Sequence, residues 1–334
     1  MSDRQDRFGR MSRREFFALS AAATAAAATG AGKARAADSA FHAVPASPLP
    51  TRQFGKTGAQ IPILTFGSGS RWMMYKEVDE ALQVMNQAID SGVIYLDTAH
   101  GYGNGKSETQ IGMLMPRRRK EVLIQTKIAT REKDQWWSDL ELSLKRMNIE
   151  YLDTCLLHSL EHEDDLEKLE VKGGPLEQLY KAKEQKLVRW AGCSGHTDGP
   201  AMAKFLARND LDVVQMALNV ATNGPFDMGF EESALPVAVK KGMGIIAMKV
   251  MGQDLIANKY ENYDYATCLR YSLSLPVTSC TVGMPKPEHL TRNLEVVRNF
   301  KPLGKEEQMK LKSAAAGEIQ TSFLNFMAGH QDVA

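Results

Sequence analysis

Cysteine is scarce in this chain, with four residues among 334. None of them falls in a C-x-x-C pair or a Cys/His cluster, so the sequence offers no ligand set for zinc or an iron–sulfur centre. Four cysteines are also too few to form a disulfide scaffold for a chain of this length. We therefore expect small, buried, apolar residues at these positions, which are Cys155, Cys193, Cys268 and Cys280.

Net charge is nearly absent too, because 41 basic residues balance 40 acidic ones and leave a formal charge of +1. Such a chain has no long-range field to attract nucleic acid or an anionic membrane surface. The uncharged run at 16–32 is too short and too rich in alanine for a stable membrane span. A hydrophobic share of 43% and a charged share of 24% are ordinary for a soluble globular protein.

The first 36 residues have the order of a secretory signal. Arg13 and Arg14 stand in the run S-R-R-E-F-F, the uncharged residues 16–32 follow, and A-R-A at 34–36 resembles a cleavage site. Paired arginines in this setting are typical of a signal read by the twin-arginine export machinery. The alternative is a disordered or helical tail with a chance arginine pair.

The expected organisation is a twin-arginine signal peptide over 1–36, a linker over 37–50 and one catalytic domain over 51–334. The twin-arginine route exports proteins that are already folded, which suits a protein that acquires a cofactor in the cytoplasm. The expected location is therefore periplasmic. Folding in the reducing cytoplasm argues further against structural disulfides.

From about Thr51 short apolar runs alternate with segments of helical period. Strands that are apolar throughout are typical of a parallel sheet covered by helices, and eight such βα units fit a single (β/α)8 barrel. A doubly wound sheet would carry G-x-G-x-x-G after its first strand, and residues 66–71 (FGSGSR) have only part of it. The predicted strands are 61–66, 94–97, 122–127, 152–158, 188–193, 213–218, 244–250 and 279–282. The predicted helices are 78–91, 138–147, 175–185, 201–207, 232–240, 266–273 and one from about 288.

Four polar residues stand at or just beyond the carboxyl ends of adjacent predicted strands, where such a barrel forms its active site. They are Asp97, Tyr102, Lys127 and His158. A buried lysine ammonium lowers the pKa of a neighbouring tyrosine, and it needs a carboxylate partner. A neutral imidazole can orient a carbonyl oxygen by a hydrogen bond. Together these groups can hold and protonate a carbonyl oxygen while a hydride reaches the carbon.

Each of the four has an ordinary structural role when it is taken alone. Asp97 could cap a helix, Tyr102 could anchor its glycine-flanked loop, Lys127 could be a solvated surface residue and His158 a core histidine. Their arrival on one rim from three adjacent strands favours a catalytic role.

The sequence around these residues resembles the aldo-keto reductase family. The run D-T-A-H-G-Y-G at 97–103 is similar to the family's D-T-A-x-x-Y-G segment, and residues 142–158 are similar to its S-L-x-R-L…D-Y-x-D…H segment. Residues 52–58 (RQFGKTG) resemble its N-terminal hairpin. The resemblance covers about 51–300.

This resemblance implies an NAD(P)H-dependent oxidoreductase that reduces an aldehyde or ketone, a small-molecule carbonyl substrate, to an alcohol. It implies Tyr102 as general acid, Lys127 and Asp97 as the groups that tune it, and His158 as the group that orients the carbonyl. One alternative is a non-catalytic sensor or partner subunit that binds the nicotinamide cofactor on the same barrel. Another is a hydrolase or lyase, which would need a metal cluster or paired carboxylates; the acidic run at 161–165 suggests only a solvated turn.

The cofactor segments match the family less closely. Gly195 stands where the family usually has Asn, and Met248 where an aromatic commonly stacks on the nicotinamide, although methionine still offers a polarisable contact. Lys286, His289 and Arg292 supply positive charge for a 2′-phosphate, so NADP is favoured over NAD; alternatively they form a solvated helix face. The resemblance implies as cofactor-binding residues Ser194, Gln215, Met248, Lys249, Gly283, Met284, Lys286, His289, Arg292 and Asn293.

The choice of substrate depends on the loops above the barrel, and the sequence of these loops does not identify it. The aromatic residues there suggest an apolar or aromatic carbonyl, or else they simply pack. These loops carry Arg71, Trp72, Tyr75, Trp136 and Trp137, together with the chain end past Lys301.

Overall fold

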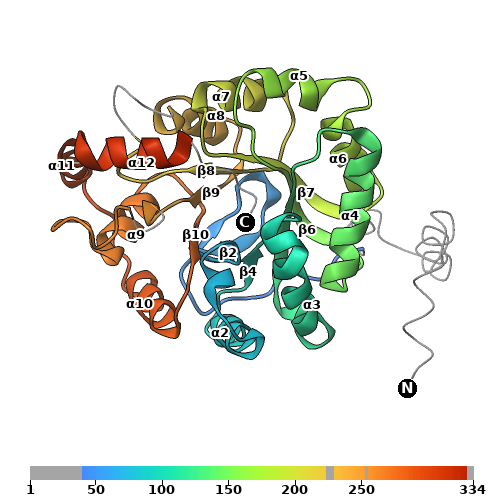
Figure 1. Ribbon diagram of the computed structural model, residues 1–334, viewed down its shortest axis with the longest axis horizontal. Helices are drawn as coiled ribbons and strands as arrows, with labels where there is room; N and C mark the ends of the chain where they lie inside the picture. Colours follow the sequence, from blue (N-terminus) through green and yellow to red (C-terminus); the bar gives the residue numbers. More distant parts are fainter. Residues whose placement is uncertain (1–39, 223–228, 253–254, 329–334) are drawn as a thin grey trace. The chain divides into compact units, whose positions relative to one another are not determined.

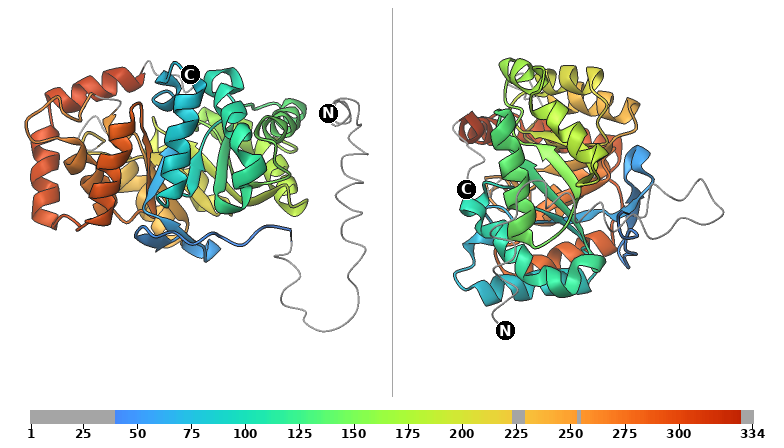
Figure 2. Two further views of the ribbon diagram at one scale, coloured as in Figure 1. Left: turned by 90° about the horizontal axis from the view of Figure 1, so that it is seen from below. Right: turned by 90° about the vertical axis from the view of Figure 1, so that its right-hand side faces the viewer.

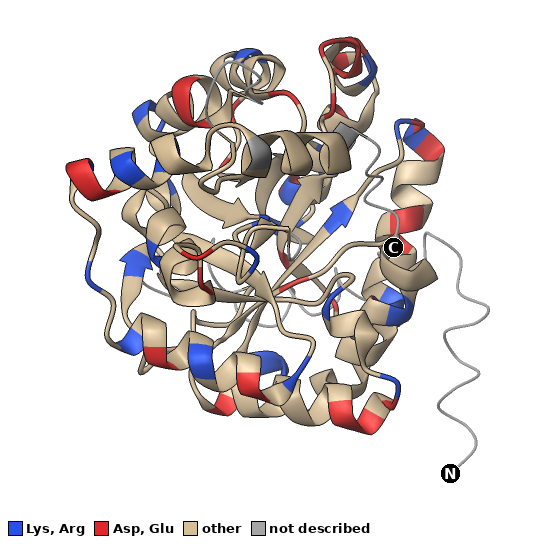
Figure 3. Ribbon diagram, turned by 60° about the vertical axis from the view of Figure 1, so that its left-hand side comes forward, with Lys and Arg blue, Asp and Glu red and all other residues tan. Residues whose placement is uncertain are grey.

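The computed structural model describes residues 40–222, 229–252 and 255–328. The predicted signal peptide, with Arg13 and Arg14, lies outside the described residues. None of the helices in the described part has both the length and the apolar character needed to cross a bilayer. Acidic and basic residues, nearly equal in number, are interspersed over the outer helices (Figure 3).

Eight parallel strands close into a barrel (Figure 1), in the order β10-β3-β4-β5-β6-β7-β8-β9. The strands β5 and β6 are buried along their whole length, because the barrel interior covers one face and helices cover the other. The prediction of a (β/α)8 barrel is therefore confirmed, and the doubly wound sheet is excluded. The strands are β3 (Leu64–Gly67), β4 (Tyr95–Asp97), β5 (Leu123–Ile128), β6 (Leu152–Leu157), β7 (Val188–Gly195), β8 (Val213–Ala217), β9 (Gly244–Met248) and β10 (Ser279–Gly283).

The helices surround the barrel, as two further views show (Figure 2). Two of them begin with an aspartate that caps the first turn: Asp198 accepts from Ala201 N at 2.8 Å, and Asp264 from Thr267 N at 2.7 Å. The helices are α2 (Val78–Asp90), α3 (Lys106–Arg118), α4 (Lys133–Met147), α5 (Asp164–Glu170), α6 (Pro175–Glu184), α7 (Gly199–Arg208), α8 (Leu235–Lys240), α9 (Tyr265–Ser274), α10 (Pro287–Arg298), α11 (Lys305–Ala315) and α12 (Glu318–Ala328). A π-helical turn, η6 (Phe230–Ala234), precedes α8.

The structure corrects the prediction in three places. The predicted first strand, 61–66, is divided between the hairpin strand β2 (Gln60–Pro62) and the barrel strand β3. No helix was predicted between the second and third strands, yet α3 lies there; it buries Ser107, Glu108 and Gln110, so it lacks a purely apolar face. The acidic run at 161–165 is not only a solvated turn, because Asp164 and Asp165 begin α5. Carboxylates in the first turn stabilise a helix because their negative charge is attracted to the positive end of the helix dipole.

A β-hairpin, β1 (Thr51–Gln53) and β2 (Gln60–Pro62), lies against the amino-terminal end of the barrel. Phe54 in its turn is fully buried and packs edge-on against Tyr95 and Trp190, with ring centroids 5.6 and 5.5 Å away. Gly55 has φ of 51°, and a Cβ there would come within 2.4 Å of Gly242 O. Only glycine allows this approach, so the hairpin turn seals one end and leaves the other end for a site.

The four cysteines are free and buried, as predicted. Burial raises the pKa of each thiol, for Cys193 and Cys268 to about 12. The described part of the predicted linker has no helix or strand, but it packs on the barrel: Leu49 is buried, and the Ser47 hydroxyl donates to Gly92 O at 2.7 Å.

Candidate active site

The four predicted catalytic residues lie together at the carboxyl end of the barrel strands. Asp97 ends β4, Lys127 lies near the end of β5, and His158 directly follows β6. Tyr102 begins η4 (Tyr102–Gly105), a short turn in the loop after β4. All four side chains are buried, and Tyr102, the most exposed, retains 9% of its accessible surface.

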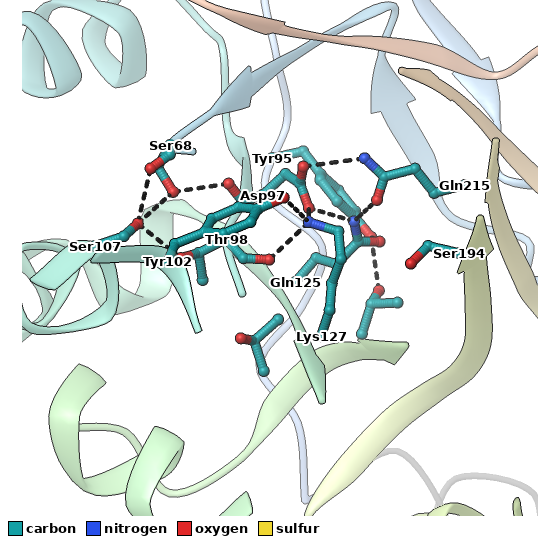
Figure 4. A network of polar contacts seen from close by, with 12 residues as sticks. Ser68, Tyr95, Asp97, Thr98, Tyr102, Ser107, Gln125, Lys127, Ser194 and Gln215 are labelled. Atoms are coloured by element: carbon teal, nitrogen blue, oxygen red, sulfur yellow. Dashed lines mark hydrogen bonds and ion pairs between the residues drawn. The ribbon is translucent and has the colours of Figure 1, made fainter. Parts of the chain in front are cut away.

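Lys127 is the centre of this cluster (Figure 4). Its ammonium group lies 2.6 Å from Asp97 Oδ1, donates to Thr98 O at 2.8 Å and donates to Tyr102 Oη at 3.3 Å. An ammonium group has three hydrogens, so these three contacts use all of them. Because Tyr102 Oη accepts from Lys127, the phenol's own hydrogen points away from the lysine.

Hydrogen bonds between hydroxyl groups hold the loop that carries Tyr102. Ser107 Oγ bonds Ser68 Oγ at 2.8 Å and Thr98 Oγ1 at 2.7 Å, and Ser68 donates to Asp97 O at 2.8 Å. Gly103 in the loop has φ of 57°, which glycine adopts at little cost. The Tyr102 ring is thereby fixed in an edge-on contact with His158, at 5.9 Å between centroids.

Asp97 receives two further hydrogen bonds, from buried amides. Gln125 Nε2 donates to Oδ1 at 2.6 Å, and Gln215 Nε2 donates to Oδ2 at 3.0 Å. Gln125 was missed in the sequence, where it stands inside an apolar strand run. Its position two residues before Lys127 could have revealed it, because residues i and i+2 of a strand lie on the same face.

We call Asp97, Tyr102, Lys127 and His158 the tetrad. A cleft runs from the tetrad towards the ends of β9 and β10 and the start of α10. Tyr102, Asp97 and Arg71 are among the residues that line it. Seven of the ten predicted cofactor residues also line it: Gln215, Met248, Lys249, Gly283, His289, Arg292 and Asn293. The other three do not: Ser194 and Met284 are buried outside the cleft wall, and Lys286 is exposed at the start of α10.

The cleft has the features that a dinucleotide needs. Gly67, Gly69 and Gly283 line it without side chains that would fill it. Thr281 Oγ1 and Arg292 Nε are buried in its wall with no hydrogen-bond partner among the described residues. Buried polar atoms of this kind are costly unless a ligand or water satisfies them, so the residues present fit an elongated polar ligand.

A cationic corner ends the cleft on α10. The Arg292 guanidinium lies 4.1 Å from the centroid of the Tyr265 ring, and the His289 ring lies 5.4 Å from the same ring. Stacking on an aromatic ring restricts an arginine without neutralising it. This corner, formed by Tyr265, His289 and Arg292, can therefore receive a phosphate.

The aromatic residues of the substrate loops mostly pack into the fold. Trp72 and Trp136 are fully buried, and Trp72 Nε1 donates to Ala81 O at 3.0 Å. Trp137 Nε1 donates to Gln178 Oε1 at 2.6 Å on α6. Of the residues named for these loops, only Arg71 lines the cleft. Within the described ranges, no group of three or more His, Cys, Asp or Glu side chains is placed to hold a metal ion.

Comparison with known proteins assigns the chain to a family. The model of the aldo/keto reductase family matches residues 64–267, and the chain therefore belongs to this family of enzymes. An uncharacterised oxidoreductase of Bacillus subtilis is 22% identical over 289 residues, which cover 73% of this chain and 90% of that protein.

Two solved structures share the fold. The holo form of an aldo-keto reductase from Bacillus halodurans has a TM-score of 0.68 at 20% identity, covering 81% of this chain and 99% of that one. An aldo-keto reductase from Klebsiella pneumoniae in complex with NADPH has a TM-score of 0.65 at 21% identity, covering 80% of this chain and 95% of that one.

Proposed function

We propose that the protein is an NADPH-dependent reductase of aldehydes or ketones, with Tyr102 as its general acid. The observation that carries the proposal is the contact of Lys127 with Tyr102 Oη at 3.3 Å. A cation that donates to the phenol oxygen stabilises the phenolate left after proton transfer. Family membership supports the same chemistry.

Each residue of the tetrad then has one task. Tyr102 gives its proton to the carbonyl oxygen, Lys127 stabilises the resulting phenolate, and Asp97 balances the lysine charge in the barrel interior. His158, beside the Tyr102 ring, donates a hydrogen bond that fixes the direction of the carbonyl. When bound, the reduced nicotinamide supplies the hydride to the carbonyl carbon.

The cleft residues divide into two groups around the cofactor. Gln215 donates to Asp97 and would hold the nicotinamide end together with Met248, while Lys249 and Gly283 would contact the rest of the dinucleotide. The cationic corner would hold the adenosine end with its 2′-phosphate. The solved Klebsiella pneumoniae relative in complex with NADPH supports this preference.

Arg292→Ala should weaken NADPH binding by roughly 10-fold or more and leave NADH binding within about 3-fold, because only NADPH presents a 2′-phosphate to the guanidinium. Arg298→Ala, an exposed arginine at the end of the same helix, is the matched control. Fluorescence titration with both nucleotides measures the two affinities. Equal losses for NADPH and NADH would place the 2′-phosphate elsewhere.

The proposal as a whole is tested by titrating the purified mature protein with NADPH and NADH and then measuring turnover on a panel of aldehydes and ketones. Binding with turnover supports the reductase. Tight binding without turnover on any carbonyl would instead favour the sensor or partner subunit. Absence of binding would reject both and leave other barrel chemistries.

We also propose that the chain is exported to the periplasm through the twin-arginine machinery, with residues 1–36 as its signal. The support is the sequence order of paired arginines, uncharged run and A-R-A site. Cofactor loading before export would suit a carbonyl reductase that works where free reduced nicotinamide is scarce.

Arg13→Lys combined with Arg14→Lys should leave the protein in the cytoplasm at its full precursor length, because the export machinery reads the arginine pair. Immunoblotting of periplasmic and cytoplasmic fractions measures this. Lys33→Arg, a basic substitution outside the pair, is the control. Undiminished export of the double variant would reject the assignment.

A further inference from the structure

Gln125 connects the two halves of the active site. It lies on β5, two residues before Lys127, and is fully buried. Its Nε2 donates to Asp97 Oδ1 at 2.6 Å and to Gln215 Oε1 at 2.7 Å. Figure 4 shows the three side chains converging inside the barrel beside Lys127. A single amide thus touches a predicted catalytic residue and a predicted cofactor residue.

The orientation of the Gln125 amide is fixed by a hydrogen bond from Tyr95. Tyr95 Oη donates to Gln125 Oε1 at 3.1 Å and bonds Thr154 Oγ1 at 2.7 Å. Burial raises the pKa of the Tyr95 phenol well above its ordinary value, so this hydroxyl stays a donor. A reversed amide would direct Oε1 at the Asp97 carboxylate, oxygen against oxygen. Both Nε2 hydrogens of Gln125 are therefore committed to Asp97 and Gln215.

We propose that Gln125 is a positioning residue that sets the proton-donor strength of Tyr102 through Asp97 and Lys127, and that couples it to cofactor binding through Gln215. The expected kinetic consequences rest on the proposed reductase function. The Gln125 side chain itself neither lines the cleft nor takes part in the reaction.

The amide dipole of Gln125 directs its positive end at Asp97, which offsets part of the carboxylate's negative charge. Without that offset Asp97 would oppose Lys127 more strongly, and the phenolate of Tyr102 would be less stabilised. The titration midpoint of Tyr102 should then rise. The ionisable groups around Tyr102 are Lys127 from β5, which donates to its oxygen, Asp97 from β4, which pairs with that lysine, and His158 after β6, whose ring contacts the Tyr102 ring. Arg71 lines the same cleft.

Gln215 is affected by the same substitution. Its amide is held at both ends, by Gln125 at Oε1 and by Asp97 at Nε2. Release of the Oε1 contact lets the amide turn, so it must be ordered again when cofactor binds, at an entropic cost. The removal of Gln125 should therefore weaken cofactor binding as well as shift Tyr102.

The test is Gln125→Met, which keeps the length of the side chain and removes both donors. The ionisation of Tyr102 is measured without cofactor or substrate, as the difference in tyrosinate absorbance between each protein and its Tyr102→Phe counterpart. We expect a midpoint higher by about half a pH unit or more. In turnover, the basic limb of kcat/KM for carbonyl reduction should move up by the same amount, because reduction needs the protonated phenol. The control is Gln178→Met, a buried glutamine on α6 outside this network.

A double-mutant cycle with Gln215→Met tests the coupling. If Gln125 acts on the cofactor through Gln215, the two losses of NADPH affinity should be less than additive. Lower thermal stability with an unchanged Tyr102 midpoint and additive affinities would overturn the proposal and leave Gln125 a structural residue. If the wild-type protein reduces no carbonyl, the reductase function fails, while the tyrosinate titration still decides the role of Gln125.

Discussion

Tyr102→Phe should lower kcat/KM for carbonyl reduction by about 10²–10⁴-fold, the usual contribution of a positioned general acid. The phenol lines the cleft, its oxygen accepts a hydrogen bond from Lys127, and it carries the hydroxyl proton that the reaction needs. Removal of one oxygen leaves the ring in its edge-on contact with His158, so the fold and the NADPH affinity should hardly change. Steady-state kinetics and a fluorescence titration on the same preparation measure the two quantities.

Tyr151→Phe is the matched control, because Tyr151 directly precedes β6 at the opposite end of the barrel and bonds His42 instead of the site. Its turnover should match that of the wild type. A Tyr102→Phe protein that reduced aldehydes at the wild-type rate would show that another group supplies the proton. A loss of NADPH affinity equal to the loss of turnover would show that Tyr102 binds rather than protonates.

The barrel could be predicted because its strands are short runs that are apolar throughout, as burial on both faces requires. Predicted strand bounds agree with the structure to within a few residues, since β5 and β6 are buried throughout. The prediction failed for α3, whose inner face carries polar residues. Glu108 there is fully buried and accepts from Thr126 Oγ1 at 2.7 Å, a partner that no local pattern reveals.

The site was predictable at its strand ends and not inside the barrel. Asp97, Lys127 and His158 could be found because parallel strands bring their carboxyl ends to one rim. Gln125 was missed although it lies two residues before Lys127 on the same strand, because its partners Asp97 and Gln215 come from β4 and β8, distant in sequence. Met284 was predicted to bind the cofactor but does not line the cleft. It follows Gly283, which does line the cleft, but its own side chain is fully buried elsewhere.

Lys127→Met should lower turnover by at least about 10²-fold and should also destabilise the folded protein by about 3–5 kcal/mol, because it leaves Asp97 charged and unbalanced in the barrel interior. Lys127 and Asp97 are 1% and 4% exposed in their side chains, so solvent cannot replace the lost partner. Urea unfolding measures the free energy, and kinetics on the folded fraction measures turnover. Lys168→Met, which breaks an exposed pair with Asp164, should change neither.

The addition of Asp97→Asn to Lys127→Met separates the two effects. The double variant has no buried charge from this pair, and the introduced amide keeps one oxygen that can accept from Gln125 but loses the oxygen that accepts from Gln215, so part of the lost stability should return. Turnover should stay low, because the phenolate of Tyr102 still lacks its cation. Recovery of both stability and turnover would mean that Lys127 only balances Asp97, and that Tyr102 needs no neighbouring charge to act as an acid.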